Sequence, residues 1–143
     1  MYKKILAPTD GSKFAEKAEE DALFIANESG AEIIVLAVVE TGFSKGLPSD
    51  EAVFNMNQLL KKEAEENIGI IKKMKEREHL DIKITFKVVE GSPADVILDM
   101  TEKEDIDLVV MGSSGKTGFR KFIMGSTAEK VVKAAKCSVL IVY

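Results

Sequence analysis

Short apolar segments alternate with amphipathic segments along the whole chain, and this alternation restricts the possible folds more than any other feature. Residues 32–39 (EIIVLAVV) are apolar almost without interruption, which is typical of a strand covered on both faces. Residues 50–77 instead repeat apolar side chains at helical spacing. The expected strands are residues 2–8, 32–39, 81–89, 107–111 and 138–143. With a helix in each of the four intervals, they predict an α/β fold: a single open parallel five-stranded sheet with helices on both faces.

The expected helix boundaries carry residues with known end preferences. Ser12 and Ser92 are expected to cap the helices that follow them, and Pro93 to take a first helical position. Gly30 is expected to end the first helix. The last helix is expected over residues 126–135.

The composition is that of one folded domain. Of 143 residues, 45% are apolar, and the 31% that are charged have mixed signs and a net charge of only −4. A pI near 5.2 argues against a nucleic-acid binder, which would carry a basic face. Cys137 is the single cysteine, and no apolar run approaches the ~18 residues that span a bilayer. We therefore expect one domain over residues 1–143, in the cytoplasm, without membrane or nucleic-acid partners.

Residues 111–128 (MGSSGKTGFRKFIMGSTA) contain Gly-Lys-Thr, the ending of the commonest ATP-binding loop. A P-loop has four residues between its first glycine and Gly-Lys-Thr, which would require a glycine where this chain has Val110. A P-loop also leads directly into a helix, whereas about ten residues separate Gly115 from the next expected helix. The segment is therefore not predicted to be a P-loop.

The same segment has other features of a phosphate site. Gly112 and Gly115 allow positive φ angles and close approach of the backbone to a ligand, and such turns aim N–H groups at an anion. Gly125, Ser126 and Thr127 supply a helix N-terminus and two hydroxyls. The segment has a charge of +3 and no acidic residue. An anionic ligand is favoured, although glycines after strands and lysine-rich loops are also common without a ligand.

Asp10 follows the first expected strand, where open α/β sheets bind ligands. Such sheets bind beyond the carboxyl ends of their strands, at the point where the strand order reverses. In the order 3-2-1-4-5, Asp10 would face the segment that begins at Gly112. Its carboxylate could accept from ribose hydroxyls or hold a Mg²⁺ already bound to phosphates. The alternative interpretation is a turn or capping residue, which is equally common.

These residues together match a known family. Gly112, Gly115 and Gly125-Ser126 fit the pattern Gly-x2-Gly-x9-Gly-(Ser/Thr), and the sequence resembles the universal stress protein family, in its ATP-binding branch. The resemblance covers the whole chain, including KKILAPTDGS, VLAVVE, VVEGSP, DLVVMGSSG and SVLIVY. It implies the strand order 3-2-1-4-5 of a Rossmann-like sheet, similar to that of the adenine nucleotide alpha hydrolases, and ATP with Mg²⁺ or Mn²⁺ as the ligand.

The resemblance also implies a role for each part of the site. Asp10 would lie near the ribose or the metal, and Val38 would offer its backbone to the adenine edge. Residues 112–118 would wrap the ribose and phosphates, and residues 125–127 would hold the distal phosphates. The residues expected to contact the ligand are Pro8, Thr9, Asp10, Val38, Met111, Gly112, Ser113, Ser114, Gly115, Lys116, Thr117, Gly118, Gly125, Ser126 and Thr127.

Two positions depart from the family pattern. Ala37 stands where family members often carry His, and Ser114 stands where His or Arg is usual. Both replacements are smaller and remove hydrogen-bond donors, while the backbone of the site is unaffected.

Residues 138–143 (SVLIVY) would form an edge strand of the sheet. An unpaired apolar edge favours association, and the family resemblance implies a homodimer through this strand. The alternative is a monomer that tolerates a short exposed edge.

Catalysis is not expected to be the main activity. ATP hydrolysis needs a positioned base or water, and His79, the only histidine, lies far from the glycines in the sequence. The favoured hypothesis is a nucleotide-dependent switch with at most slow ATP hydrolysis and an unknown protein partner. An adenylating enzyme or an FMN carrier would need a phosphate loop after the first strand, which APTDGSKF does not provide. A dimeric interaction protein that binds no nucleotide stays as the alternative.

Overall fold

The computed structural model describes residues 1–40, 46–114 and 123–143. Its strands are β1 (Lys4–Thr9), β2 (Glu32–Val39), β3 (Ile84–Glu90), β4 (Leu108–Gly112) and β5 (Ser138–Val142). Its helices are α1 (Lys13–Ser29), α2 (Asp50–Arg77), α3 (Pro93–Lys103) and α4 (Ser126–Ala134). All strand pairs are parallel, in the order β3-β2-β1-β4-β5, so the predicted sheet and strand order are confirmed.

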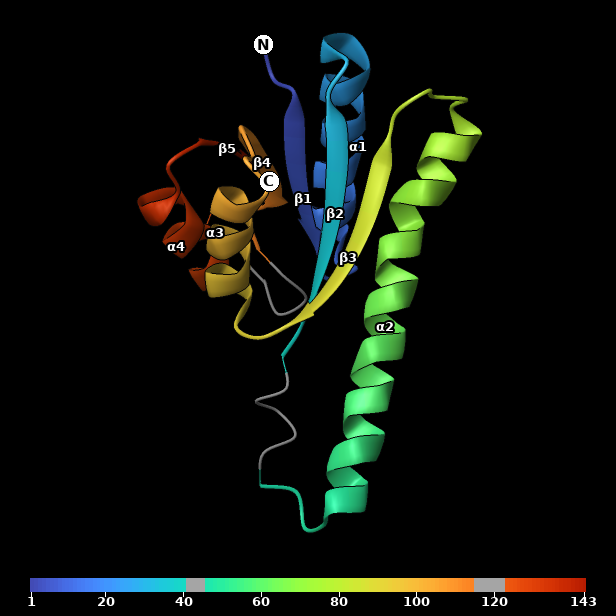
Figure 1. Cartoon of the computed structure of the whole chain (residues 1–143), viewed down its shortest axis with the longest axis vertical. Helices are drawn as coiled ribbons and strands as arrows, with labels where there is room; N and C mark the ends of the chain where they lie inside the picture. Colours follow the sequence, from blue (N-terminus) through green and yellow to red (C-terminus); the bar gives the residue numbers. More distant parts are fainter. Residues whose placement is uncertain (41–45, 115–122) are drawn as a thin grey trace.

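Helices cover both faces of the sheet (Figure 1). α1 and α2 pack on one face through a core that includes Ile5, Val35 and Ile71. α3 and α4 pack on the other face through a core that includes Leu6 and Val131. Successive residues of a strand point to opposite faces, so a strand between two helix layers must be apolar at every position. Among the described residues, no helix is both long and apolar enough to cross a membrane.

The helix ends follow the expected chemistry with one exception. The Ser12 side chain accepts a hydrogen bond from the Ala15 N–H at 3.1 Å, and Gly30 ends α1 with φ of 74°. Pro93 is the first residue of α3, as expected. Ser92 occupies the N-cap position of α3 as predicted, but its exposed side chain makes no capping hydrogen bond. Solvent is available to the hydroxyl there, which removes the need for a partner within the protein.

The third strand begins at residue 84 and not at residue 81 as predicted. Its neighbour β2 begins at Glu32, and the first residue pair between the two strands joins Ile33 to Ile84. Residues 81–83 therefore have no strand beside them to extend the ladder. Ile82 is apolar because it packs into the core beneath α1 and α2, which explains why the sequence pattern resembled a strand there.

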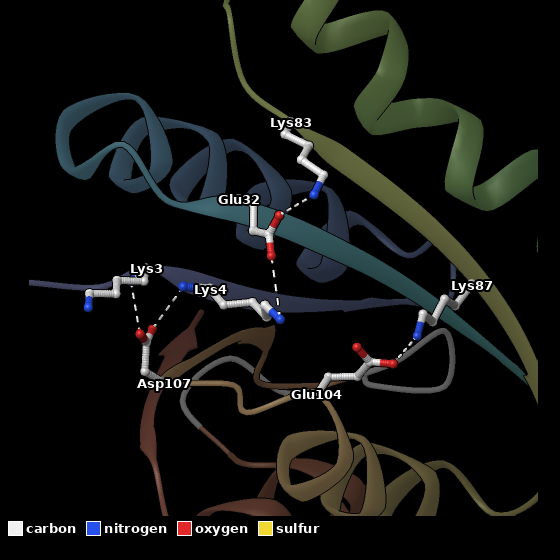
Figure 2. A network of polar contacts seen from close by, with 7 residues as sticks. All are labelled: Lys3, Lys4, Glu32, Lys83, Lys87, Glu104 and Asp107. Carbon is white, nitrogen blue, oxygen red and sulfur yellow. Dashed lines mark hydrogen bonds and ion pairs between the residues drawn. The ribbon is translucent and has the colours of Figure 1, made fainter.

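Charged groups connect the amino ends of the strands, which we call the amino edge of the sheet (Figure 2). Figure 2 shows Lys3, Lys4, Glu32, Lys83 and Asp107 at this edge, and it also draws Lys87, in the middle of β3, with its ion-pair partner Glu104. The Glu32 carboxylate of β2 lies 3.4 Å from Lys4 Nζ on β1 and 2.8 Å from Lys83 Nζ, just before β3. The Asp107 carboxylate, just before β4, accepts the backbone N–H groups of Lys3 at 2.8 Å and Lys4 at 3.3 Å. These bonds tie β1 to the strands on both sides of it.

Candidate functional site

The opposite, carboxyl edge of the sheet opens into a crevice with a volume of about 820 Å³. Residues at the ends of β1, β2 and β4 form its floor, α2 contributes one wall, and residues at the starts of α3 and α4 contribute the other. Eleven of the expected ligand residues line it: Pro8, Thr9, Asp10, Val38, Met111, Gly112, Ser113, Ser114, Gly125, Ser126 and Thr127. The other four, Gly115, Lys116, Thr117 and Gly118, lie outside the described residues.

The turn after β1 places Asp10 at the crevice. Its Oδ1 atom accepts the Ser12 N–H at 2.9 Å, and the Thr9 hydroxyl accepts the Gly11 N–H at 3.3 Å. Gly11 has φ of 77°, which favours glycine, and a Cβ atom there would overlap the Asn67 side chain of α2. Asp10 therefore has the local turn role, and it also lines the crevice.

Gly112, at the end of β4, and Gly125, just before α4, both lie very close to neighbouring atoms of the protein. A Cβ atom on Gly112 would lie 2.7 Å from the backbone carbonyl carbon of Phe14 in α1. A Cβ atom on Gly125 would lie 3.3 Å from the Ser113 carbonyl oxygen. Neither glycine has a positive φ angle. The positive φ angle that glycine allows at position 112 is therefore not adopted, and the missing side chain instead lets α1 approach the end of β4.

The end of β4 and the start of α4 lie directly against each other. The Gly125 N–H donates to the Ser113 carbonyl oxygen at 2.6 Å. The Ser114 hydroxyl donates to the Ile123 carbonyl oxygen at 3.3 Å. The two parts of the predicted phosphate site are thus brought together on one side of the crevice.

The N-terminus of α4 supplies hydrogen-bond donors at this side of the crevice. Ser126, Thr127 and Ala128 begin the helix, where N–H groups have no partner within the helix. No side chain among the described residues caps α4. The Ser113 N–H donates to the Val142 carbonyl at 2.8 Å, and the Gly125 N–H donates to the Ser113 carbonyl. Both N–H groups therefore already have a partner within the protein. An anion here would therefore be met by the first turn of α4 and not by a nest of N–H groups at residues 113 and 125.

Val38 presents its backbone to the crevice. The β1–β2 pairing ends at Thr9 and Ala37, so β1 does not extend beside Val38. The Val39 carbonyl accepts the Gly91 N–H at 3.0 Å on the β3 side. Because successive carbonyls of a strand point to opposite neighbours, the Val38 carbonyl points toward the space beyond the end of β1. That space is the crevice.

Residues 1–143 match the universal stress protein family. The universal stress protein MJ0531 of Methanocaldococcus jannaschii is 42% identical over 142 residues, which cover 99% of this chain and 82% of that protein. MJ0577 of the same organism is 32% identical, and its solved structure has a TM-score of 0.83, with 99% of this chain and 96% of that chain covered. The chain belongs to the universal stress protein family.

A protein of the universal stress protein family from Arabidopsis thaliana has been solved with AMP bound. The likeness covers 98% of this chain and 90% of that chain, with a TM-score of 0.69 and 18% identity. At that identity the comparison shows the shared fold alone.

In this universal stress protein, α2 contributes crevice residues that the sequence did not reveal. Leu60, Glu63, Ala64 and Asn67 all line the wall opposite α4. Leu60 and Ala64 belong to the apolar stripe of the expected helix, and Asn67 lies on the next turn of the same face. The helical spacing therefore predicted that this face of α2 points toward the rest of the protein, but it could not show that the face lies beside the crevice.

A metal ion would need oxygen ligands from its own nucleotide as well as from the protein. Among the described residues, no group of three or more His, Cys, Asp or Glu side chains is placed to bind a metal. Asp10 is a hard oxygen ligand of the type that Mg²⁺ and Mn²⁺ prefer, and it lines the crevice. One carboxylate and several phosphate oxygens form a usual set for Mg²⁺ in nucleotide sites.

Proposed function

We propose that this universal stress protein binds ATP, with Mg²⁺ or Mn²⁺, in the crevice and acts as a nucleotide-dependent switch. The observation that carries the proposal is the bond of 2.6 Å between the Gly125 N–H and the Ser113 carbonyl, which places the start of α4 beside the end of β4. A helix N-terminus next to a strand end is a common phosphate site in open α/β sheets. The AMP bound by the Arabidopsis family member agrees with an adenine nucleotide as the ligand.

The polarity of the crevice favours one orientation of the nucleotide. The phosphates would lie at the first turn of α4, where N–H groups are available. The base would lie against the backbone of Val38 and the side chain of Met111, with the ribose near Asp10.

Asp10 and the phosphates would together hold the metal. The metal would neutralise charge on the phosphates, and the carboxylate would fix its position at the end of β1. This arrangement binds and orients a nucleotide without needing a catalytic base. His79 follows the last turn of α2, remote from the crevice-lining part of that helix. We therefore propose binding with at most slow hydrolysis, and a switch that an as yet unknown protein partner reads.

We further propose that the protein forms a homodimer through residues 138–143. β5 is the last strand in the sheet order, and Leu140 of β5 (37%) and Tyr143, which follows it (46%), are exposed apolar side chains. Antiparallel pairing with a second copy would satisfy the open strand edge and bury part of this apolar surface. Sedimentation equilibrium should give twice the chain mass of 15.7 kDa. A mass of one chain at all concentrations would contradict the dimer without affecting the nucleotide proposal.

The test of nucleotide binding uses proline to remove one backbone donor. Ser126 is the first residue of α4, a position where proline fits, and Gly125 before it has φ of −69° and ψ of 166°, angles that proline permits. Ser126→Pro removes the N–H and the hydroxyl, while the control Ser126→Ala removes only the hydroxyl. Because a hydrogen bond to a charged group contributes about 1.5–3 kcal/mol, we expect Ser126→Pro to weaken ATP binding roughly tenfold or more relative to Ser126→Ala.

Isothermal titration calorimetry with ATP and MgCl₂ measures this difference. Circular dichroism of both variants checks that α4 is retained. Equal affinities for ATP in Ser126→Pro and Ser126→Ala would mean that the first turn of α4 does not bind the phosphates. A parent protein that binds no adenine nucleotide, and from which mass spectrometry recovers none after purification, would instead favour a dimeric interaction protein of the same fold.

A further inference from the structure

Glu19 is a buried carboxyl that the proposed function does not use. It lies on the inner face of α1 with Ala15, Ala18 and Ala22, and its side chain has an exposure of 0%. Neither of its carboxyl oxygens makes a hydrogen bond with a described residue. An ionised carboxylate is very costly in such a place, because neither water nor a partner compensates for its charge.

Glu19 lies next to the floor of the crevice. The Thr9 hydroxyl lies beside the carboxyl, although no hydrogen bond of acceptable geometry joins the two. Thr9 also lines the crevice, and its hydroxyl accepts the N–H of Gly11 in the turn that contains Asp10. Thr9 thus borders both the buried carboxyl and the ligand site.

The surroundings of Glu19 favour its protonated form. Burial is the main reason that the pKa of Glu19 is raised, and the negative charges of Glu16 on α1 and Asp10 after β1 raise it further. The Thr9 hydroxyl has the opposite effect and lowers the pKa. The side chains that β4, β5 and α2 bring to the core on this face include Val110, Val142 and Ile71, which are uncharged. Together these effects raise the pKa of Glu19 from 4.5 to about 8.

We propose that loss of the Glu19 proton weakens nucleotide binding in the crevice, so that the site is regulated by pH; this inference rests on the proposed function. An ionised Glu19 places a negative charge behind Thr9 and Asp10, close to where an anionic ligand would lie. The Thr9 hydroxyl alone does not compensate for a buried charge, so α1 must shift or admit water to solvate it. α1 carries Ala15, which lines the crevice, and Phe14, which packs against Gly112. Both effects weaken binding of an anion at the carboxyl edge.

The test compares pH profiles of ATP affinity for the parent, Glu19→Gln and Glu20→Gln. Glutamine keeps the size of Glu19 but cannot ionise, and Glu20 is an exposed carboxylate on the same helix, which makes it a matched control. The dissociation constant is measured from about pH 6.5 to about pH 9, on either side of the raised pKa, with and without MgCl₂. The ionisation of ATP itself affects all three proteins equally. We expect the dissociation constant of the parent to rise about fivefold more than that of Glu19→Gln, with Glu20→Gln following the parent.

The possible outcomes separate the inference from the proposed function. If the parent and Glu19→Gln both bind ATP with the same pH profile, the inference is wrong and the proposed function stands. If the parent binds ATP at no pH, both are wrong. A difference that appears only where circular dichroism shows unfolding also overturns the inference, because a purely structural role of Glu19 predicts that pattern. Glu19→Leu, an apolar residue of similar size, replaces Glu19→Gln if the buried amide prevents folding.

Discussion

The two edges of the sheet use their polar groups in opposite ways. At the amino edge, charged side chains are paired: Glu32 lies between Lys4 and Lys83, and Asp107 accepts backbone N–H groups (Figure 2). At the carboxyl edge, the first turn of α4 has no side-chain cap among the described residues. Groups that are already paired have little left to offer a ligand. The crevice, and not the amino edge, is therefore the candidate site.

The edges also differ in what a substitution should cost. The amino-edge ion pairs are partly exposed, and such pairs contribute little individually. The carboxyl edge depends on a backbone approach at Gly112 and has a buried carboxyl at Glu19 behind it. We therefore expect large effects on stability near the carboxyl edge, small ones at the amino edge, and effects on ligand affinity only at the carboxyl edge.

The largest expected effect is the pH dependence of stability that Glu19 causes. Its pKa is raised from 4.5 to about 8 in the folded protein, so folding favours the protonated form. The contribution of Glu19 to the free energy of unfolding is therefore fully present below about pH 4.5 and is lost as the pH rises toward 8. The loss should amount to about 3 kcal/mol between pH 5 and pH 8. Urea unfolding across this range should show the fall in the parent. Glu19→Leu should remove it, and Glu20→Gln should keep it. An unchanged slope in Glu19→Leu would mean that other groups cause the pH dependence.

The second expected effect is the destabilisation caused by Gly112→Ala. The new Cβ atom would lie 2.7 Å from the backbone of Phe14, so α1 and β4 must move apart, at a cost of about 2 kcal/mol. Gly69→Ala is the matched control, because Gly69 lies inside α2 and a Cβ atom there would have nothing within 4 Å. This control should stabilise the protein by about 0.5–1 kcal/mol, since alanine favours a helix interior. Urea unfolding of both variants tests the pair, and equal effects would mean that the approach of α1 to β4 is not tight.

The fold could be predicted from the sequence because the alternation of strands and helices is a local property. Each apolar run, such as that of β2, reports how its own segment is covered. The start of β3 was less predictable, since Ile82 is apolar through core packing while its backbone has no strand to pair with. The order of the strands is not a local property, and it came from the family resemblance.

The sequence was enough to predict which residues form the candidate site, but not what structural role each of them has. The glycine pattern marked Gly112, yet only the structure shows that α1 and not a ligand occupies the space beside it. The buried face of α1 is made mostly of alanines, and a charged residue such as Glu19 between them would normally be assigned to solvent from the sequence. Its burial depends on how α1 sits on the sheet. The same holds for Asn67, whose contact with the turn at Gly11 needs the position of α2.

The smallest expected effect is at the amino edge, where Glu32→Gln removes the contacts with Lys83 and Lys4. Hydrogen bonding to Lys83 is the main reason that the pKa of Glu32 is lowered. A lowered pKa stabilises the folded protein above the unfolded value of 4.5, and this contribution is lost as the pH falls through the folded value. At neutral pH and low salt, calorimetry should show a melting temperature lower by about 2 °C, and the difference should disappear in acid or about 1 M NaCl.

Glu102→Gln is the control for this last variant, because the Glu102–Lys136 pair is more exposed than the contacts of Glu32 and should contribute even less. The measurement that decides the comparison is the ATP affinity of Glu32→Gln. If the edges are independent, the affinity equals that of the parent, because the substitution leaves the crevice unchanged. A weaker affinity would mean that the pairing across β1 at one edge is transmitted along the strand to the turn at Asp10. The amino edge would then be part of the ligand site, and the division of the sheet into an amino edge of paired charges and a ligand-binding carboxyl edge would be wrong.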